Sequence, residues 1–534
     1  MIRIRDLTLP VGQEQTSLLY LAAQALHIRS SEIASLQIFR RSLDARRKPE
    51  LYWVYTVDVT LRAGESAAVR RCRDRRITRE TPYYYQIPKC TSAQRPVVVG
   101  FGPAGMFAAL VLAKAGLRPI VLERGEAAPE RRAKVEAFWN GGALDPESNV
   151  QFGEGGAGTF SDGKLNTGTK NERSRWVLQQ LVKHGAQEEI LYDAKPHIGT
   201  DVLFTVVQRL RGTVERLGGE VRFGARLIGL ERENGALTAV RYVRGGEERR
   251  LECASVILAV GHSARDTLRA LSAEGVALEP KPFSMGVRIE QRQERIDLAQ
   301  YGAERAPSVP PADYKLNVHL PDGSSAYTFC MCPGGYVVAA ASQTGGVVTN
   351  GMSNAARENE NANAALLVTL APEDFPYPGA FGGMQWQEEL ERRAFAVGGS
   401  NYHAPAQTVA DFLEKRPSER LGAVHPSYRP GVTLCDLHDV LPKRITDTLE
   451  QALPALEERL TGFAAPDAVL TAPETRSSSP VRIPRDKTLQ ASLRGLYPCG
   501  EGAGYAGGIM SAAVDGMLCA EAVMRSGKKE EDPK

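Results

Sequence analysis

Apolar runs and helical patterns alternate along residues 95–270. Val97-Val98-Val99 and Ile120-Val121-Leu122 are continuous apolar runs, as in strands buried on both faces, and the stretch from Met106 to Ala113 between them has the composition of a buried helix. A strand, a helix and a second strand in this order predict a parallel sheet with crossover helices. We therefore expect an α/β unit in this part of the chain.

The first 90 residues predict a small separate α+β unit. Strands are expected near Ile2–Leu7, Leu36–Arg41 and Tyr52–Leu61, with a helix near Ser17–Ala25. The strand near Tyr52–Leu61 has the strongest pattern, because aromatic and β-branched residues dominate it. Residues 82–96 contain three prolines around three consecutive tyrosines and predict an irregular linker.

The pattern changes again after residue 280. Tyr327–Cys332 and Tyr336–Ala341 read as two strands around the turn Pro333-Gly334-Gly335, and a further strand is expected through Val347-Val348. This favours an inserted, mostly antiparallel domain. The predicted domains are 1–90 (α+β), 91–280 (first part of a nucleotide-binding domain), 281–460 (inserted substrate or cap domain) and 461–525 (its C-terminal part), followed by a charged tail, 526–534.

Composition adds few constraints. The chain has 534 residues, 43% hydrophobic and 24% charged, with a net charge of +3, all ordinary for a soluble globular protein. Its eight scattered cysteines do not resemble a secreted disulfide scaffold, and no stretch approaches a membrane span or a signal peptide, so a cytoplasmic location is expected. Six arginines cluster between Arg70 and Arg79. We interpret them as a solvated face, and a nucleic-acid partner is not expected.

The first chemical motif is Gly100-x-Gly102-x-x-Gly105, which includes Pro103 and Ala104 and joins the strand Val97–Val99 to the following helix. Its glycines permit a tight turn, close approach of a pyrophosphate and close helix packing, and the helix N-terminus adds about half a positive charge. The next strand ends in Glu123-Arg124, where a carboxylate is placed to accept ribose hydroxyls. The motif predicts dinucleotide binding.

Three later segments indicate a bulkier cofactor than a nicotinamide dinucleotide. A second Gly-rich loop runs from Phe152 to Leu165, a strand closes on Gly261-His262, and a third Gly-rich loop precedes a helix start near Met510. The candidate cofactor-binding residues in these segments are Gly156, Gly158, Ser161, Lys164, Gly261, Gly500, Glu501, Gly507, Gly508 and Ile509.

Taken in order, these four segments resemble the FAD-binding fold shared by relatives of glutathione reductase, fumarate reductase and p-hydroxybenzoate hydroxylase. Within that fold the chain resembles a bacterial family of FAD-dependent dehydrogenases, from about residue 30 to 525. The resemblance includes Ser42–Arg46, Ser161–Lys164, Gly351–Ser353 and Glu474–Arg482. It implies a Rossmann-like FAD-binding domain, with the substrate domain inserted and the small α+β domain at the N-terminus.

The resemblance also implies roles for single residues. Gly100, Gly102 and Gly105 would hold the pyrophosphate and Glu123 the AMP ribose, while Glu501 stands where relatives carry an aspartate that binds the ribityl–phosphate portion. The helix that begins near Gly507-Gly508 would direct its amides at the flavin N1/O2 edge. A second Gly-x-Gly-x-x-Gly after a strand is absent from the sequence, so NAD(P)H is expected at most as a transient electron donor.

Six residues are candidates for catalysis. Cys330 and Cys332, about 6–7 Å apart at Cα on one face of a strand, are either a redox dithiol or core packing. Arg288 and Arg476 could clamp an anionic substrate or form ordinary salt bridges, and Arg288 should point away from the buried face unless it meets a cavity. Lys164 and His262 could act as a general acid or as a cation beside the flavin, although His262 could equally cap its turn. No metal site is expected.

The leading hypothesis is an FAD-dependent oxidoreductase that transfers two electrons between a small-molecule substrate and flavin N5. The substrate would lie between the 281–460 domain and the isoalloxazine. One alternative is a flavin-dependent protein that modifies RNA bound by the basic N-terminal domain. The other is a flavin-holding redox sensor without turnover.

Overall fold

The computed structural model describes residues 1–82, 84–90, 94–166 and 171–526. The part of the expected tail beyond Ser526 lies outside the described residues, as does Tyr83 of the tyrosine run. Among the helices of the described residues, none combines the length and hydropathy that crossing a bilayer would require.

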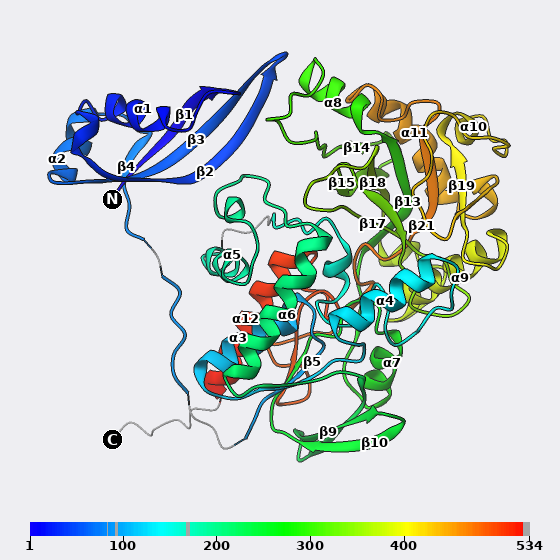
Figure 1. Cartoon of the computed structure of the whole chain (residues 1–534). Helices are drawn as coiled ribbons and strands as arrows, with labels where there is room; N and C mark the ends of the chain where they lie inside the picture. Colours follow the sequence, from blue (N-terminus) through cyan, green and yellow to red (C-terminus); the bar gives the residue numbers. More distant parts are fainter. Residues whose placement is uncertain (83, 91–93, 167–170, 527–534) are drawn as a thin grey trace, which may run out of the picture.

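A four-stranded antiparallel sheet forms the N-terminal unit, drawn in blue in Figure 1. Side chains of β1 alternate inward and outward, and the inward residues Ile2 and Ile4 pack with Leu18 of the helix that covers the sheet. This is the half-buried strand pattern that the sequence predicts. In spatial order the strands are β2 (Ile33–Arg47), β3 (Glu50–Leu61), β1 (Ile2–Pro10) and β4 (Ile77–Arg79), with α1 (Ser17–Ala25), η1 (Ser30–Glu32) and α2 (Glu65–Cys72).

A five-stranded parallel sheet lies at the centre of the nucleotide-binding unit. Its strands are short, and in four of the five every residue is buried. Helices cover one face of the sheet, and a three-stranded antiparallel sheet with one helix covers the other. The spatial order is β23 (Leu496–Pro498), β11 (Val256–Leu258), β5 (Val97–Val99), β6 (Ile120–Leu122) and β7 (Glu220–Arg222). The α/β fold class predicted from the alternating pattern is confirmed.

Helices α3 (Pro103–Ala115), α6 (Thr200–Arg216) and α12 (Ile509–Ser526) lie together beside this sheet (Figure 1). Gly516 of α12 meets α3 so closely that an added Cβ would lie 2.0 Å from the Ala104 carbonyl oxygen. The C-terminal helix is therefore packed directly on the helix that follows the first glycine motif. The remaining elements of this unit are α4 (Ala128–Trp139), η2 (Ala157–Phe160), α5 (Arg173–Lys183), η3 (Glu188–Leu191), α7 (Arg265–Ala273) and the antiparallel strands β8 (Ala225–Glu233), β9 (Ala236–Arg244) and β10 (Glu247–Glu252).

A seven-stranded sheet forms the third unit and is antiparallel except for one parallel pair, β19 with β20. Its order is β14 (Asn317–His319), β15 (Ser325–Cys332), β18 (Asn361–Leu370), β13 (Phe283–Arg292), β21 (Val469–Glu474), β19 (Ala404–Thr408) and β20 (Val432–Leu434). Around it lie α8 (Gln293–Tyr301), η4 (Pro372–Asp374), α9 (Gly382–Val397), α10 (Val409–Leu413), η5 (Leu437–Asp439) and α11 (Lys443–Glu457), with the small pairs β16 (Tyr336–Ala339) with β17 (Thr349–Met352) and β12 (Glu279–Pro280) with β22 (Val481–Arg482).

Two details of this unit differ from the sequence prediction. Strands β15 and β16 flank Pro333-Gly334-Gly335 but do not pair as a hairpin, since β15 joins the large sheet whereas β16 pairs with β17. The strand expected through Val347-Val348 begins at Thr349. The turn therefore directs the chain from one sheet into another, and Cys332 remains at the end of the large sheet.

The long β2–β3 hairpin connects the N-terminal unit to both other units. Arg41 donates two hydrogen bonds to Asp193, at 2.7 and 3.0 Å, and the backbones of Arg41 and Tyr192 are also hydrogen-bonded. Near the hairpin tip, Lys48 donates to the Ala299 carbonyl oxygen at the end of α8, at 2.5 Å. The hairpin therefore contacts the nucleotide-binding unit and the seven-stranded unit at the same time.

Candidate functional site

A cavity of about 680 Å³ lies at the carboxyl ends of the parallel strands. Its wall comes from the loops after β5, β6, β11 and β23, from the loop around Gly156–Lys164, and from β15 of the seven-stranded sheet. In open parallel α/β sheets, ligands bind outside the carboxyl ends of the strands. The cavity occupies this position and reaches from the parallel sheet to the antiparallel one.

The first glycine motif forms one end of the cavity. Gly100 has φ +95°, and a Cβ there would lie 2.3 Å from the Ala259 carbonyl oxygen, while a Cβ on Gly105 would lie 1.9 Å from the Gly100 carbonyl oxygen. Neither site admits a side chain. Gly102, by contrast, faces the cavity, and α3 begins directly after it with Pro103 at its first turn, so that the amide end of the helix is directed at the cavity.

Glu123 is buried beside this loop and is held by backbone amides. Its Oε2 accepts from Phe101 N at 2.7 Å, and its Oε1 accepts from Gly125 N and Gly153 N, both at 2.9 Å. Two carboxylate oxygens offer about four acceptor positions, so three are used here and one remains. Its neighbour Arg124 lines the cavity and pairs with Glu147 and Asp266.

The second glycine loop packs against the first. A Cβ on Gly156 would lie 2.9 Å from Gly102 Cα, and one on Gly158 would lie 3.2 Å from Ile509. Arg131 of α4 is buried beneath the loop and donates to the carbonyl oxygens of Asn149, Val150, Glu154 and Gly156. Sequence reasoning missed Arg131, because nothing in the sequence distinguishes it from its charged neighbours Glu130 and Arg132 on the same helix.

The third glycine loop provides the start of α12. Gly507 and Gly508 line the cavity, and a Cβ on either would have nothing within 4 Å. The cradle beside them therefore has room for a ligand. Glu501, on the same loop, also lines the cavity, and burial raises the pKa of its carboxyl to about 8.

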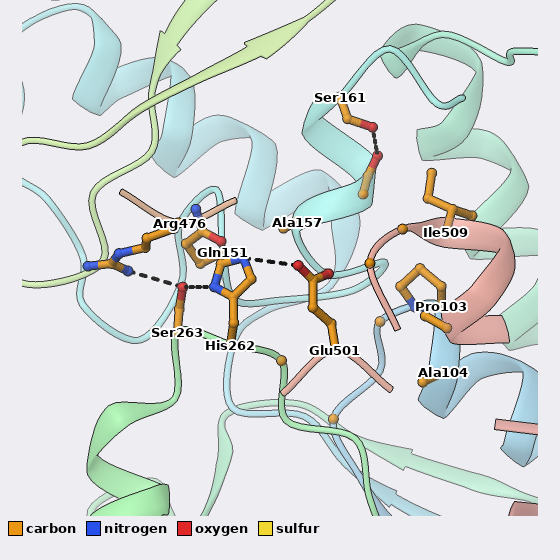
Figure 2. Close-up of a pocket in the computed structure, with 18 of the residues that line it drawn as sticks. Pro103, Ala104, Gln151, Ala157, Ser161, His262, Ser263, Arg476, Glu501 and Ile509 are labelled. Carbon is orange, nitrogen blue, oxygen red and sulfur yellow. Dashed lines mark hydrogen bonds and ion pairs between the residues drawn. The ribbon is translucent and has the colours of Figure 1, made fainter. Parts of the chain in front are cut away.

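A chain of polar contacts runs along another wall, as Figure 2 shows. Arg476 Nη1 donates to Ser263 Oγ at 3.1 Å, Ser263 Oγ lies 2.9 Å from His262 Nδ1, and His262 Nε2 lies 3.8 Å from Glu501 Oε1. Burial, together with the guanidinium groups of Arg476 and Arg265, lowers the pKa of His262 to about 3. Burial therefore favours the neutral ring of His262 over the imidazolium.

The strand β15 closes the opposite end of the cavity. Cys330, in the left-handed region at φ +41°, lines the cavity, and the pairing register of β15 with β18 breaks between Phe329 and Cys332. Lys164 reaches across from the second glycine loop and donates to the Met331 carbonyl oxygen. This end of the cavity combines a thiol with an ammonium group.

Arg288 lies behind that strand and is fully buried, so the expectation that it points away from the buried face is wrong. Its guanidinium pairs with Glu474 at 3.1 Å and donates to Asn363 Oδ1 and to the Cys330 carbonyl oxygen. A Cβ on Gly351 would lie 1.9 Å from Arg288 Nη2, so that glycine makes room for the guanidinium. The sequence alternation failed here because an ion pair inside the sheet compensates the burial of the charge.

The cavity brings together most of the residues that the sequence singles out. Those that line it are Gly100, Gly102, Pro103, Ala104, Glu123, Arg124, Gly156, Gly158, Ser161, Lys164, Gly261, His262, Cys330, Arg476, Glu501, Gly507, Gly508 and Ile509. Gly105, Gly500, Arg288 and Cys332 lie behind the wall. Lining residues to which sequence reasoning assigned no role include Gln151, Ser263, Asn350 and Glu474, none of which belongs to a glycine motif.

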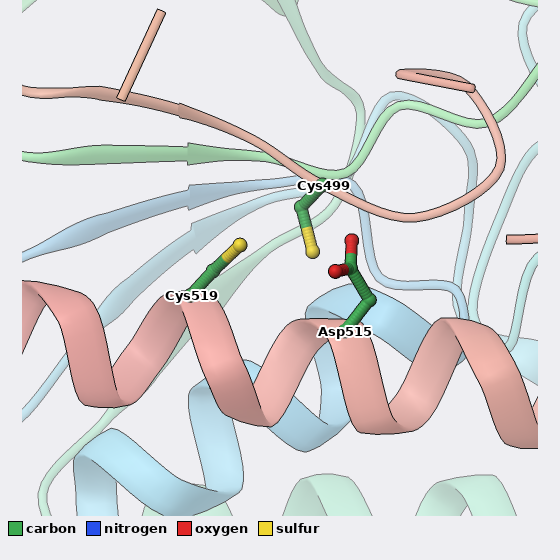
Figure 3. Close-up of side chains that lie close together, drawn as sticks. All are labelled: Cys499, Asp515 and Cys519. Atoms are coloured by element: carbon green, nitrogen blue, oxygen red, sulfur yellow. The ribbon is translucent and has the colours of Figure 1, made fainter. Parts of the chain in front are cut away.

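Two further clusters have structural explanations. Cys499, Asp515 and Cys519 point toward one another (Figure 3), with their potential ligand atoms within 4.8 Å, but Arg485 holds both oxygens of Asp515, at 3.0 and 2.6 Å. In the N-terminal unit, the six arginines between Arg70 and Arg79 are exposed on α2, on β4 and on the segment that joins them, and Arg76 pairs with Asp74. This agrees with a solvated face.

Comparison with known proteins gives three matching family models. The model described as pyridine nucleotide-disulphide oxidoreductase matches residues 94–296, the model described as FAD-dependent protein, C-terminal domain-like, matches residues 282–477, and a domain of unknown function matches residues 1–60. A protein of Clostridium beijerinckii, described as uncharacterized, is 44% identical over 529 residues, which cover 98% of both chains.

Solved structures are similar at lower identity. A geranylgeranyl bacteriochlorophyll reductase-like protein from Thermoplasma acidophilum is 15% identical, with a TM-score of 0.36 over 81% of this chain and 78% of that one. A 3-ketosteroid-delta4-(5alpha)-dehydrogenase from Rhodococcus jostii is 13% identical, with a TM-score of 0.32 over 83% of this chain and 100% of that one.

Proposed function

This chain belongs to one family with the Clostridium beijerinckii protein, a family of FAD-dependent oxidoreductases, and we propose that it transfers two electrons between FAD and a small molecule in the cavity. The observation that carries the proposal is the extent of the cavity. It runs from the glycine motif at Gly100 to Cys330 on the seven-stranded sheet, so a dinucleotide end and a separate reaction end share one enclosure.

The residues at the first end suit an FAD molecule. Amides at the start of α3 beside Gly102 would bind the pyrophosphate, and the remaining acceptor position of Glu123 would take a ribose hydroxyl. The tight packing of Gly105 behind this loop would keep α3 close to its strand. Glu501 and the open cradle at Gly507-Gly508 would hold the ribityl chain and the ring edge. FAD, when bound, supplies a two-electron acceptor and donor at N5.

The reaction end would lie between Lys164, Cys330 and the ring. Lys164 is fixed there by its bond to the Met331 carbonyl oxygen and supplies positive charge, which would stabilise an anionic substrate group or a developing negative charge. His262, neutral and hydrogen-bonded to Ser263, would orient Glu501 and would not act as a cation. We also propose NAD(P)H as a transient electron donor to the flavin.

The purified protein tests this proposal in two stages. A flavin spectrum that is lost in Gly102→Val but kept in the control Gly212→Val would support the cofactor site. Gly212 lies on α6, and a Cβ there would meet only the flexible end of Arg216, at 3.4 Å. Anaerobic stopped-flow mixing with NADH, NADPH or a reduced quinone, followed by reoxidation with a metabolite panel, then identifies donor and acceptor. Absence of flavin reduction by every donor would overturn the two-electron proposal and favour the redox-sensor alternative.

A further inference from the structure

Cys330 and Cys332 occupy unequal positions at the end of β15. Cys330 is half-buried and lines the cavity, whereas Cys332 is completely buried behind the wall. The break in register after Phe329 and the left-handed backbone of Cys330 separate the two residues from the regular strand. One thiol is therefore accessible from the cavity, and the other is shielded beside it.

A buried cation lies against this pair. Arg288 Nη2 donates to the Cys330 carbonyl oxygen at 2.6 Å and lies 3.6 Å from Cys332 Sγ, and Cys332 Sγ lies 3.3 Å from the same carbonyl oxygen. Cysteines that serve as small hydrophobic packing groups have apolar surroundings. Positive charge close to a sulfur instead favours the thiolate, which is the nucleophilic form.

The pKa values of the two thiols are also shifted in opposite directions. A hydrogen bond from the Cys332 thiol, followed by the charges of Arg288 and Lys164, lowers the pKa of Cys330 to about 6 despite its burial. Burial raises the pKa of Cys332 well above its ordinary value. Neighbouring positive charge thus favours the thiolate at the accessible sulfur, whereas burial favours the protonated form at the shielded one.

We propose that Cys330 and Cys332 form a redox-active thiol pair that reduces a low-molecular-weight disulfide entering the cavity. The Cys330 thiolate attacks one sulfur of the disulfide, a Cys330–S–S–R bond forms, and the second half leaves as a thiolate. Cys332 then loses its proton and attacks Cys330, a Cys330–Cys332 disulfide forms, and the first half leaves as a second thiolate. Two electrons pass from the pair to the substrate, which becomes two thiols after protonation. This proposal rests on the proposed function at one point only: two electrons from the flavin would reduce the Cys330–Cys332 disulfide back to the two thiols.

The backbone permits the bond between the two cysteines. Residues two apart in an extended strand are separated by about 6.6 Å at Cα, close to the upper limit of about 6.8 Å for disulfides. This separation depends on the backbone of the intervening residue Met331, and the break in register between Phe329 and Cys332 takes this segment out of the regular strand. A charged group available to take the proton of Cys332 is Glu474, which pairs with Arg288 and whose pKa burial raises to about 7.

The test is a redox titration of the full-length protein in glutathione buffers of increasing oxidised fraction, with and without FAD. After acid quenching and alkylation, trypsin releases residues 316–357 as one peptide, which contains Cys330 and Cys332 and no other cysteine. We expect this peptide to lose two hydrogens and to become resistant to alkylation, and dithiothreitol should reverse both changes.

Three variants sharpen the titration. In Cys332→Ser the second attack is blocked, so the peptide should retain one glutathione at Cys330. In Cys330→Ser the buried Cys332 should remain unmodified. Cys435→Ser, a half-buried cysteine elsewhere in the chain, is the matched control and should oxidise like the parent protein. Thermal unfolding of each variant verifies that it is folded.

The outcomes separate this proposal from the proposed function. If the peptide stays fully reduced in the most oxidising buffer, or if folded Cys332→Ser traps no glutathione, the thiol pair is not redox-active, even where flavin reduction and reoxidation proceed. If the disulfide forms reversibly in protein that lacks flavin reduction, the thiol pair stands and the two-electron flavin proposal fails.

Discussion

Arg476 and Glu391 meet in a buried bidentate pair, with Nε 2.9 Å from Oε1 and Nη2 2.8 Å from Oε2. The same carboxylate also binds both terminal nitrogens of Arg265, at 2.8 and 2.9 Å. One glutamate of α9 thus binds two buried guanidinium groups, of which Arg476 lines the cavity. The geometry favours the salt-bridge interpretation of Arg476 over a substrate clamp.

Glu391→Gln should therefore destabilise the protein strongly. Removing the carboxylate leaves the buried Arg476 without its bidentate partner and Arg265 with only Glu388, at 4.0 Å, which costs about 3–5 kcal/mol. Urea unfolding measures the change. On the same helix, Glu389→Gln removes an exposed pair with Arg393 and should cost only about 0.5 kcal/mol, so equal losses in the two variants would contradict the role of Glu391.

His262 should make stability depend on pH in the acid range. Its pKa of about 3 in the folded state lies below its ordinary value of 6.5, so between these values the unfolded chain binds a proton that the folded chain does not. Stability therefore falls as pH falls from 6.5 toward 3, by about 2 kcal/mol at pH 5. His262→Gln lacks this titration, and its stability should fall less steeply over the same interval. Parallel curves for both proteins would refute the assignment.

Gly105→Ala should damage the cofactor site through packing alone. The added methyl would lie 1.9 Å from the Gly100 carbonyl oxygen, so α3 must move away from its strand. We expect a loss of about 1–3 kcal/mol in unfolding free energy and weaker FAD binding, measured by flavin fluorescence. Gly212→Ala, on α6 with space for the methyl, should leave FAD binding unchanged and stabilise the helix by about 0.5–1 kcal/mol.

FAD should stabilise the fold, and this effect should depend on Glu123. At 100 times the dissociation constant, a ligand that binds the folded state adds about 2.7 kcal/mol, seen as a higher Tm. Glu123→Gln replaces one acceptor oxygen with a donor that faces backbone amides, so the rise in Tm should shrink sharply. The exposed Glu130→Gln on α4 provides the control. If FAD raised the Tm of Glu123→Gln as much as that of the parent protein, Glu123 would not contribute to FAD binding.

The reactivity of Cys330 should show an unusual pH dependence. Because its pKa is about 6, its alkylation rate should already be near its maximum at pH 7, whereas an ordinary thiol reacts slowly there. Cys332→Ala removes the largest influence that lowers this pKa and should shift the profile upward by about one unit. The charges of Arg288, Lys164 and Asp162 remain in that variant. An unshifted profile would show that Cys332 does not stabilise the thiolate.

The glycine motifs were predictable because the local backbone leaves no space for a side chain at these positions. Gly100 and Gly105 are excluded from carrying a side chain by atoms close to them in sequence or on the adjoining strand, and such requirements recur with fixed spacing. Helix α1 was predicted to the residue for a related reason, since its apolar face is encoded locally.

Contacts between distant segments could not be predicted in this way. Arg131, Arg288 and Glu391 are buried charges whose partners lie up to 186 residues away in the chain, as for Arg288 and Glu474. No local pattern encodes such partners, and hydropathy places all three residues at the surface. The expected hairpin at Pro333-Gly334-Gly335 failed because sheet membership is decided by strands that come later in the sequence.

The β2–β3 hairpin has a mechanical consequence. It is anchored through Arg41 to Asp193 and through Lys48 to the end of α8, so it acts as a brace between the two large units. Any rotation that widened the enclosure by moving these units apart would stretch the brace and break one of its two anchors. The N-terminal unit therefore helps to keep the nucleotide-binding unit and the seven-stranded unit at a fixed separation.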